Sequence, residues 1–221
     1  MDALEAIRHR RAVRSYTDRP VSEEDIDALL KLALLAPTGH MAQAWSFVVV
    51  REAEQRAALA DLVLRGGADY FREGRPPKEG TSAEEHAQWA ADYAEQALGT
   101  YRDVPVWICG ITVPRFSMEH DVLERIERFS DVTSVSFALE NLFVAARAMG
   151  LGTTPTIFHL FHEDEFRELL NLPDDVEAHY LTPLGYPTEF PKGLRPAVAK
   201  SRRPWRSLVH DEKWGSPRAE A

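Results

Sequence analysis

Apolar residues recur at helical spacing along most of this chain, and short runs of β-branched residues separate the helical stretches. The spacing predicts helices over residues 2–10, 22–36, 51–65, 86–99, 118–128, 131–150 and 163–170. Strands are predicted at residues 46–50, 104–111 and 178–184, and residues 153–157 form a strand or an extended segment. A few short strands set among helices are typical of an α+β domain with a small mixed sheet.

Three of these segments also predict burial or mobility. The β-branched run at residues 46–50 predicts a strand that is buried on both faces. Asp131 is placed to cap the helix that ends at Gly150, which is apolar nearly all round and therefore central or at a subunit interface. Residues 66–85 combine glycines and prolines with charges, which indicates an exposed loop or a mobile flap.

Length and composition narrow the class of protein. The chain has 221 residues with 26 Lys and Arg against 35 Asp and Glu, a net charge of −9. This acidic balance argues against a general nucleic-acid binder. No apolar run reaches the ~20 residues of a membrane helix, so no membrane partner is expected. With no secretory signal at its start and a lone cysteine, Cys109, the chain is expected to be cytoplasmic.

The basic residues are concentrated in two blocks near the ends of this acidic chain. Residues 8–19 hold five arginines and one acid, and residues 190–210 hold six cationic residues and no acid. Each block can be a solvated face. If the blocks meet in space, they form one anion pocket, because guanidinium donors match phosphate oxygens two at a time.

Common catalytic motifs are absent from the sequence. There is no G-x-G-x-x-G, no phosphate-binding P-loop, no H-E-x-x-H and no G-x-S-x-G. His159 and His162 lie three residues apart but have no third ligand in view, so no metal site is expected. The sequence therefore offers no obvious nucleophilic side chain or metal site for catalysis.

Several motifs, taken in order, resemble the FMN-dependent nitroreductase family. They are His9-Arg10-Arg11-Ala12-Val13-Arg14-Ser15-Tyr16, Pro20-Val21, Ala36-Pro37-Thr38, Gln43-Ala44-Trp45-Ser46-Phe47-Val48-Val49, Ala148-Met149-Gly150-Leu151-Gly152, Pro183-Leu184-Gly185-Tyr186-Pro187 and Lys200-Ser201-Arg202-Arg203-Pro204. The resemblance spans most of the chain except residues 66–99. It implies a single nitroreductase-like domain over residues 1–221, with a small mixed or antiparallel sheet surrounded by helices. It also implies a mobile flap around residues 66–99 and an extended C-terminal tail packed on the partner subunit.

The same resemblance assigns cofactor-binding residues. The FMN phosphate and ribityl chain would be held by basic residues of both blocks, namely Arg10, Arg11, Arg14, Lys200 and Arg202. The flavin ring would lie against a loop that usually comes from the other subunit, comprising Pro37, Thr38, Gly39 and Met41. Pro155, Thr156 and Ile157 would run past the ring, with a backbone N–H directed at flavin N5. His40, Tyr70 and Phe71 are the candidate substrate contacts.

Three positions depart from the family pattern. Ala12 stands where the family often has Ser, Met41 where many members have Asn, and Ala44 where Pro is usual. The changes at Ala12 and Met41 remove polar groups that would contact the phosphate and the ring, respectively.

The resemblance implies an enzyme in which FMN carries the chemistry and no side chain is catalytic. NADH or NADPH would reduce the flavin, and a nitroaromatic, quinone or similar small acceptor would then reoxidise it by a ping-pong mechanism. Two alternatives stay open, namely an enzyme that fragments flavin and a non-catalytic flavin-binding or redox-sensing protein. A homodimer with FMN at the subunit interface is expected.

Overall fold

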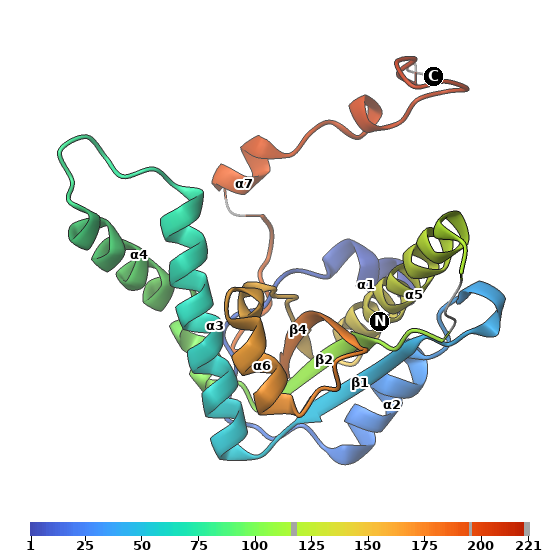
Figure 1. Ribbon diagram of the computed structural model, residues 1–221, viewed down its shortest axis with the longest axis horizontal. Helices are drawn as coiled ribbons and strands as arrows, with labels where there is room; N and C mark the ends of the chain where they lie inside the picture. Colours follow the sequence, from blue (N-terminus) through green and yellow to red (C-terminus); the bar gives the residue numbers. More distant parts are fainter. Residues whose placement is uncertain (116–118, 195, 219–221) are drawn as a thin grey trace. The chain divides into compact units, whose positions relative to one another are not determined.

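A four-stranded antiparallel sheet with the strand order β1-β2-β4-β3 organises the first 190 residues (Figure 1). The strands are β1 (Trp45–Val50), β2 (Val106–Thr112), β3 (Gly152–Thr153) and β4 (Glu177–Gly185). The structure, a computed structural model, describes residues 1–115, 119–194 and 196–218. It divides into two units, residues 1–190 and 191–221, each considered by itself. The α+β prediction is confirmed, whereas a single domain over residues 1–221 stays a prediction.

Helices cover both faces of the sheet. They are α1 (Ala3–His9), α2 (Glu23–Ala33), α3 (Ala53–Gly74), α4 (Ala83–Leu98), α5 (Asp121–Ala148) and α6 (Glu163–Leu170). Short 3₁₀ turns η1 (Gly39–Met41), η2 (Gly99–Asp103) and η3 (Phe158–His162) connect them. Local capping explains where two of the helices begin. Ser22 accepts a hydrogen bond from the Asp25 amide, and Ser82 forms a capping box with Glu85.

Strand β2 lies at the centre of the core and is buried along its whole length. Its side chains alternate between two apolar clusters. Trp107 and Cys109 join the cluster that includes α3 and α6, while Val106 and Ile108 join the cluster that includes α2 and α5. The sheet is therefore a layer between two sets of helices.

The structure corrects the prediction for residues 66–85. Helix α3 continues through Gly66 and Gly67 to Gly74, so only residues 75–82 connect it to α4. A Cβ atom on Gly66 would lie 2.0 Å from the Phe158 carbonyl oxygen, and one on Gly67 would lie 2.5 Å from Leu98 Cδ1. These glycines allow neighbouring backbone and side chains to approach the helix and do not break it.

Two further predictions are wrong in detail. Asp131 does not cap a helix, because α5 is continuous from Asp121 to Ala148 and Asp131 lies within it. Its side chain is buried. Burial raises the pKa of the Asp131 carboxyl, and the nearby Glu127 adds to the rise. Strand β1 is an edge strand whose side chains are mostly half-exposed in the single chain, so it is not buried on both faces. The predicted helix start at Met118 lies outside the described residues.

The second unit is short and has few buried side chains. It contains α7 (Pro196–Ser201) and η4 (Trp205–Leu208), and Trp205 and Trp214 are exposed. Packing of this tail on a partner subunit stays a prediction. Among the described residues, no helix combines the length and the apolar character needed to cross a membrane.

Candidate functional site

The arginine-rich N-terminal segment lies directly beside the segment that precedes Pro155. Ala12 and Thr153 form a parallel β-bridge, and the Val13 amide donates to the Thr153 carbonyl at 3.1 Å. The approach is close because Gly152 has no side chain, and a Cβ atom there would lie 2.7 Å from Val13 Cγ1. Two predicted parts of the site, 141 to 147 residues apart in sequence, are therefore neighbours in the fold.

The three arginines of this segment have different surroundings. Arg10 is half-buried, with its Nε 4.0 Å from Glu140 Oε1. Arg11 Nη1 donates to the carbonyls of Arg8 and Arg10, at 2.9 and 2.7 Å, while its Nε is buried without an acceptor in the described part of the chain. Buried donors of this kind are costly unless a partner is bound. Arg11 thus presents an unsatisfied cationic donor beside the β-bridge.

Arg14 lies near a tyrosine that the sequence analysis did not single out. The side chains of Arg14 and Thr154 both lower the pKa of the Tyr101 phenol. Burial raises the pKa of Tyr101 more than these two partners lower it, so the phenol stays neutral. Tyr101 lies in η2, between a predicted helix and a predicted strand. Its aromatic side chain was the one feature of the sequence that could have drawn attention to it. Tyr101 therefore lies close to both the arginine segment and the segment that leads to Pro155.

Residues 155–157 alternate between exposed and buried positions. Thr156 is buried and exchanges two backbone hydrogen bonds with Leu181 of β4, at 2.9 and 3.0 Å. Pro155 and Ile157 are exposed on either side of it. Among the described residues, the Ile157 amide has no hydrogen-bond acceptor. A residue held by a β-bridge therefore precedes a backbone donor that has no acceptor in the described part of the chain.

The loop that contains Pro37, Thr38 and Gly39 has an unusual backbone. His40 and Met41 have positive φ angles of 49° and 56°, which L-residues rarely adopt. The Thr38 hydroxyl accepts a hydrogen bond from the Gln43 amide at 3.0 Å and so closes the loop. His40 and Met41 are consequently exposed, and Met41 is 74% exposed.

Helix α5 separates this loop from the arginine segment of the same chain. Gly39 packs on Ser130, because a Cβ atom on Gly39 would lie 2.1 Å from Ser130 Oγ. The arginine segment contacts α5 farther along, at Glu140 and at Arg147, whose Nε donates to the His9 carbonyl at 3.3 Å. At 1.5 Å per residue, these contacts lie roughly 15 to 25 Å from Ser130 along the helix axis. The structure does not bring these two predicted parts together within one chain.

The candidate substrate residues Tyr70 and Phe71 lie at the end of α3 beside η3. The Tyr70 ring lies 5.3 Å from the Phe158 ring and 6.3 Å from the Phe161 ring. Phe71 is half-buried between Phe158, at 5.9 Å, and Tyr93, at 4.7 Å. Because Phe158 directly follows Ile157, both residues are neighbours of the free amide. His40 is not among these contacts.

Lys200 and Arg202 belong to the second unit. Lys200 lies in α7 and Arg202 follows it, and both side chains are exposed. Their contribution to an anion site with the arginine segment stays a prediction. Arg195, which belongs to the same basic block, lies outside the described residues.

Comparisons with known proteins identify the family and several similar proteins. A sequence model of the Nitroreductase family matches residues 7–186. The FMN reductase (NADPH) of Bacillus subtilis is 29% identical over 204 residues, covering 90% of this chain and 71% of that protein. The nitrobenzene nitroreductase of Ectopseudomonas oleovorans is 28% identical over 189 residues, covering 76% of this chain and 79% of that protein. The solved structure of a BluB-like flavoprotein from Clostridium difficile 630 aligns with a TM-score of 0.73 at 20% identity, over 96% of this chain and 100% of that chain.

Proposed function

This chain belongs to the nitroreductase family, and from that membership we propose that it is an FMN-dependent oxidoreductase that uses NADH or NADPH. The observation that carries the proposal is a pair of unengaged donors on adjacent segments. One is the buried Arg11 Nε and the other is the Ile157 amide. An anionic, hydrogen-bonding cofactor satisfies both.

The residues of this site fit FMN by their chemistry. Arg10 and Arg11 supply charge for a phosphate dianion, and among the described residues Arg10 pairs with a single distant carboxylate, Glu140 at 4.0 Å. Lys200 and Arg202 would add cationic groups from the second unit. When bound, FMN supplies hydride transfer between a nicotinamide donor and an acceptor, so the chain needs no nucleophile of its own.

The chain's own part in the reaction is positioning and electrostatic stabilisation. The Ile157 N–H is held by the neighbouring Thr156–Leu181 backbone pair, so it can donate at a fixed point. Pro155 has no N–H, and the side chain of Ile157 is apolar. The backbone is therefore the polar group that this segment offers to the ring.

A homodimer explains the separation along α5. Since one chain holds its Pro37–Met41 loop roughly 15 to 25 Å from its arginines, a second chain would supply the loop to each flavin. The outer face of α5 supports this arrangement. It exposes a row of apolar side chains at helical spacing, namely Val122, Ile126, Phe129 and Phe137.

The acceptor is proposed to be a small planar electrophile such as a nitroaromatic or a quinone. The surface beside Ile157 is apolar and aromatic, with Tyr70 at 48%, Leu160 at 43% and Phe161 at 45% exposure. Such a surface favours stacking with flat rings. A ping-pong order follows if donor and acceptor use this same face in turn.

An absorbance spectrum with anaerobic reduction tests the proposal. Purified protein supplemented with FMN should show flavin bands that bleach rapidly on addition of NADH or NADPH and return on addition of a quinone. Flavin bands that neither nucleotide bleaches would contradict the enzyme assignment and favour flavin binding alone. Protein that stays colourless after addition of FMN would overturn the cofactor assignment.

A further inference from the structure

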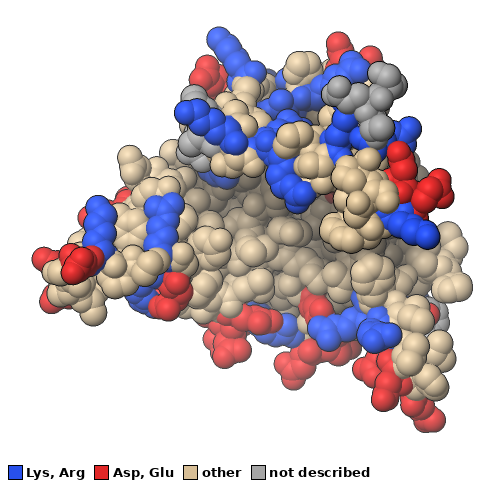
Figure 2. Space-filling view, turned by 90° about the horizontal axis from the view of Figure 1, so that it is seen from above, with Lys and Arg blue, Asp and Glu red and all other residues tan. Residues whose placement is uncertain are grey.

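A pocket opens at the end of the helical hairpin formed by α3 and α4. Its volume is about 450 Å³, within the range of small-molecule sites. The lining residues are Arg75, Pro76, Lys78, Thr81, His86 and Trp89, with no Asp or Glu among them. Figure 2 shows cationic side chains at this end of the molecule, on the left, with acidic side chains at its outer and lower margins.

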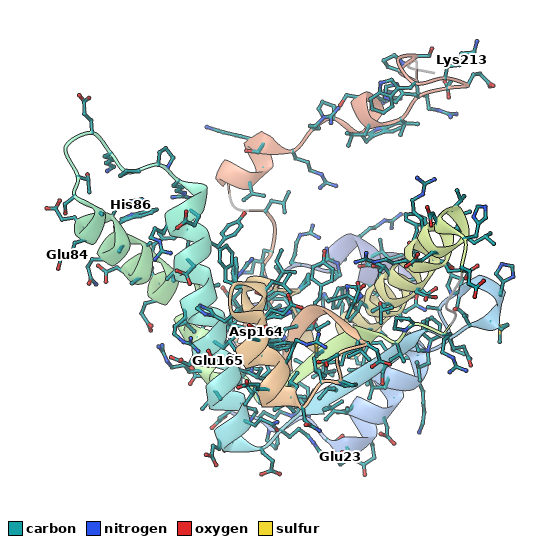
Figure 3. The ribbon with its side chains drawn as sticks, in the orientation of Figure 1. Glu23, Glu84, His86, Asp164, Glu165 and Lys213 are labelled. Atoms are coloured by element: carbon teal, nitrogen blue, oxygen red, sulfur yellow. The ribbon has the colours of Figure 1, made fainter. Side chains whose placement is uncertain are left out.

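One wall of the pocket is a stack of aromatic rings on α4. His86 and Trp89 stack at 5.3 Å with an interplanar angle of 11°, and Trp89 and Tyr93 stack at 5.8 Å with 23°. These positions, i, i+3 and i+7, share one face of a helix. His86 is fixed by a contact between its Nε2 and the Arg72 carbonyl at 3.1 Å. Figure 3 labels His86 beside the connecting loop and Glu84 at the outer edge of the hairpin.

The cations of this pocket are positioned without being neutralised. The Arg75 guanidinium lies 5.0 Å from the Tyr93 ring centroid and 5.6 Å from that of Trp89. In the described part of the chain, neither Arg75 nor Lys78 pairs its side chain with a carboxylate. A guanidinium held by ring faces keeps its N–H donors free for a ligand.

Two of the neighbouring carboxylates, Glu85 and Glu73, have other partners. Glu85 accepts the Ser82 amide at 2.8 Å in the capping box, which lowers the pKa of Glu85. Glu73 pairs with Arg72 at 3.0 Å. The cationic character of the pocket is thus set by Arg75 and Lys78.

A second cavity, of about 590 Å³, provides a contrast. It is lined by Asp18 and Asp103 as well as Arg51 and Arg56. Arg56 already donates to the carbonyls of Arg51 and Val104, at 2.9 and 2.7 Å. With its acids present and this guanidinium engaged, that cavity has no clear preference for an anion.

Aromatic contacts connect the hairpin pocket to the candidate flavin site. Tyr93 contacts Phe71 at 4.7 Å, Phe71 contacts Phe158 at 5.9 Å, and Phe158 follows Ile157 in the chain. Two ring contacts, Tyr93–Phe71 and Phe71–Phe158, therefore lie between the aromatic wall of the pocket and the segment that carries Ile157.

We propose that the hairpin pocket binds a planar aromatic ring that carries an anionic group. This inference rests on the proposed function, which supplies two sources of such chemistry. One is the adenosine phosphate end of the nicotinamide donor, and the other is an acceptor that is an aromatic acid. The ring stacks on the Trp89 wall, and the anion pairs with Arg75 and Lys78.

Ligand titration on the FMN-loaded protein tests the pocket directly. Calorimetry would measure the Kd of 2′,5′-ADP, 5′-AMP and 4-nitrobenzoate, with adenosine and nitrobenzene as the neutral counterparts. In the Arg75→Ala/Lys78→Ala variant, the Kd of the anionic ligands should rise ~10-fold or more. Lys31→Ala, which removes an exposed cation on α2, is the matched control and should leave the Kd unchanged.

The source of the ligand follows from which anion binds more tightly. Tighter binding of 2′,5′-ADP, with a raised KM for NADPH in the double variant, assigns the pocket to the donor. Tighter binding of 4-nitrobenzoate, with a raised KM for that acceptor, assigns it to the acceptor. Trp89→Phe should keep most of the affinity and Trp89→Ala should lose it, because stacking needs a ring.

Failure of this inference is distinguishable from failure of the proposed function. Equal Kd values in the wild type and the double variant, or equal binding of neutral and anionic ligands, would overturn the pocket assignment while flavin reduction continues. Flavin that no nucleotide reduces would overturn the proposed function, and the calorimetric comparison would still decide whether the pocket binds aromatic anions.

Discussion

The backbone of Gly66 in α3 lies directly against the carbonyl group of Phe158. A Cβ atom on Gly66 would be 2.0 Å from the Phe158 oxygen and 2.8 Å from its carbonyl carbon. No side chain fits there, since the obstructing atoms belong to backbone. This contact fixes η3, and with it the segment that carries the Ile157 amide, against the second half of α3.

Gly66→Ala should destabilise the protein, whereas Gly74→Ala should not. The first substitution forces a helix and a neighbouring backbone apart and should cost about 1–3 kcal/mol of unfolding free energy. The second adds a methyl group where nothing lies within 4 Å, and it should stabilise the helix by up to ~1 kcal/mol. Urea unfolding at one protein concentration measures both values. Equal stability of the two variants would contradict the close approach.

Arg10→Ala and Arg202→Ala should each weaken FMN retention. A charge-assisted hydrogen bond is worth about 1.5–3 kcal/mol, so the Kd for FMN should rise by ~10-fold or more. Equilibrium dialysis measures the change, and Lys31→Ala serves as the control cation. If both variants retain FMN as the wild type does, the arginine segment and the tail do not form the phosphate site.

Phe129→Asp should produce a monomer that loses flavin. Phe129 is 73% exposed in the single chain and lies in the apolar row of α5, so a buried carboxylate there would oppose association. Light scattering gives the mass, and the absorbance spectrum gives the flavin content. Ala57→Asp, at an exposed position of α3, should leave both unchanged. A monomeric wild type would refute the dimer before any variant is compared.

Stability should fall as the pH drops from 6.5 towards 4, in part because of His159. Burial lowers the pKa of this histidine from 6.5 to about 4, although the His179 backbone acts in the opposite direction. Between these values the unfolded state binds the proton and the folded state does not, so the unfolding free energy rises with pH and levels off above 6.5. The full effect is on the order of 3 kcal/mol.

His159→Phe should flatten this pH dependence. The ring packs 4.3 Å from Phe166, so an aromatic replacement keeps an apolar contact while removing the titrating group. Urea unfolding at pH 5 and pH 7 gives the difference for each protein. Some slope should persist, because burial also lowers the pKa of His179. An unchanged pH dependence would show that His159 does not set it.

Much of the fold follows from interactions between residues close in sequence. The start of α2 at Ser22, the bounds of α6 and the presence of strand β2 are all readable from the chain, because each depends on residues within one element. The arginine segment and its match to a flavin-binding family are also readable, since residue type and order carry them.

The tertiary structure decided what depends on contacts between distant segments. In the sequence, Gly66 and Gly67 indicate a break in the helix. In the structure, η3, about 90 residues later, packs against Gly66 at a place where no side chain fits. The sequence predicts Asp131 as a helix cap, whereas the structure places it within the continuous helix α5. The missing acceptor of the Ile157 amide and the separation of loop and arginines along α5 have no local signal. Periodicity and capping report neighbours within a turn or two, whereas close approach and burial are set by the surfaces that folding brings together.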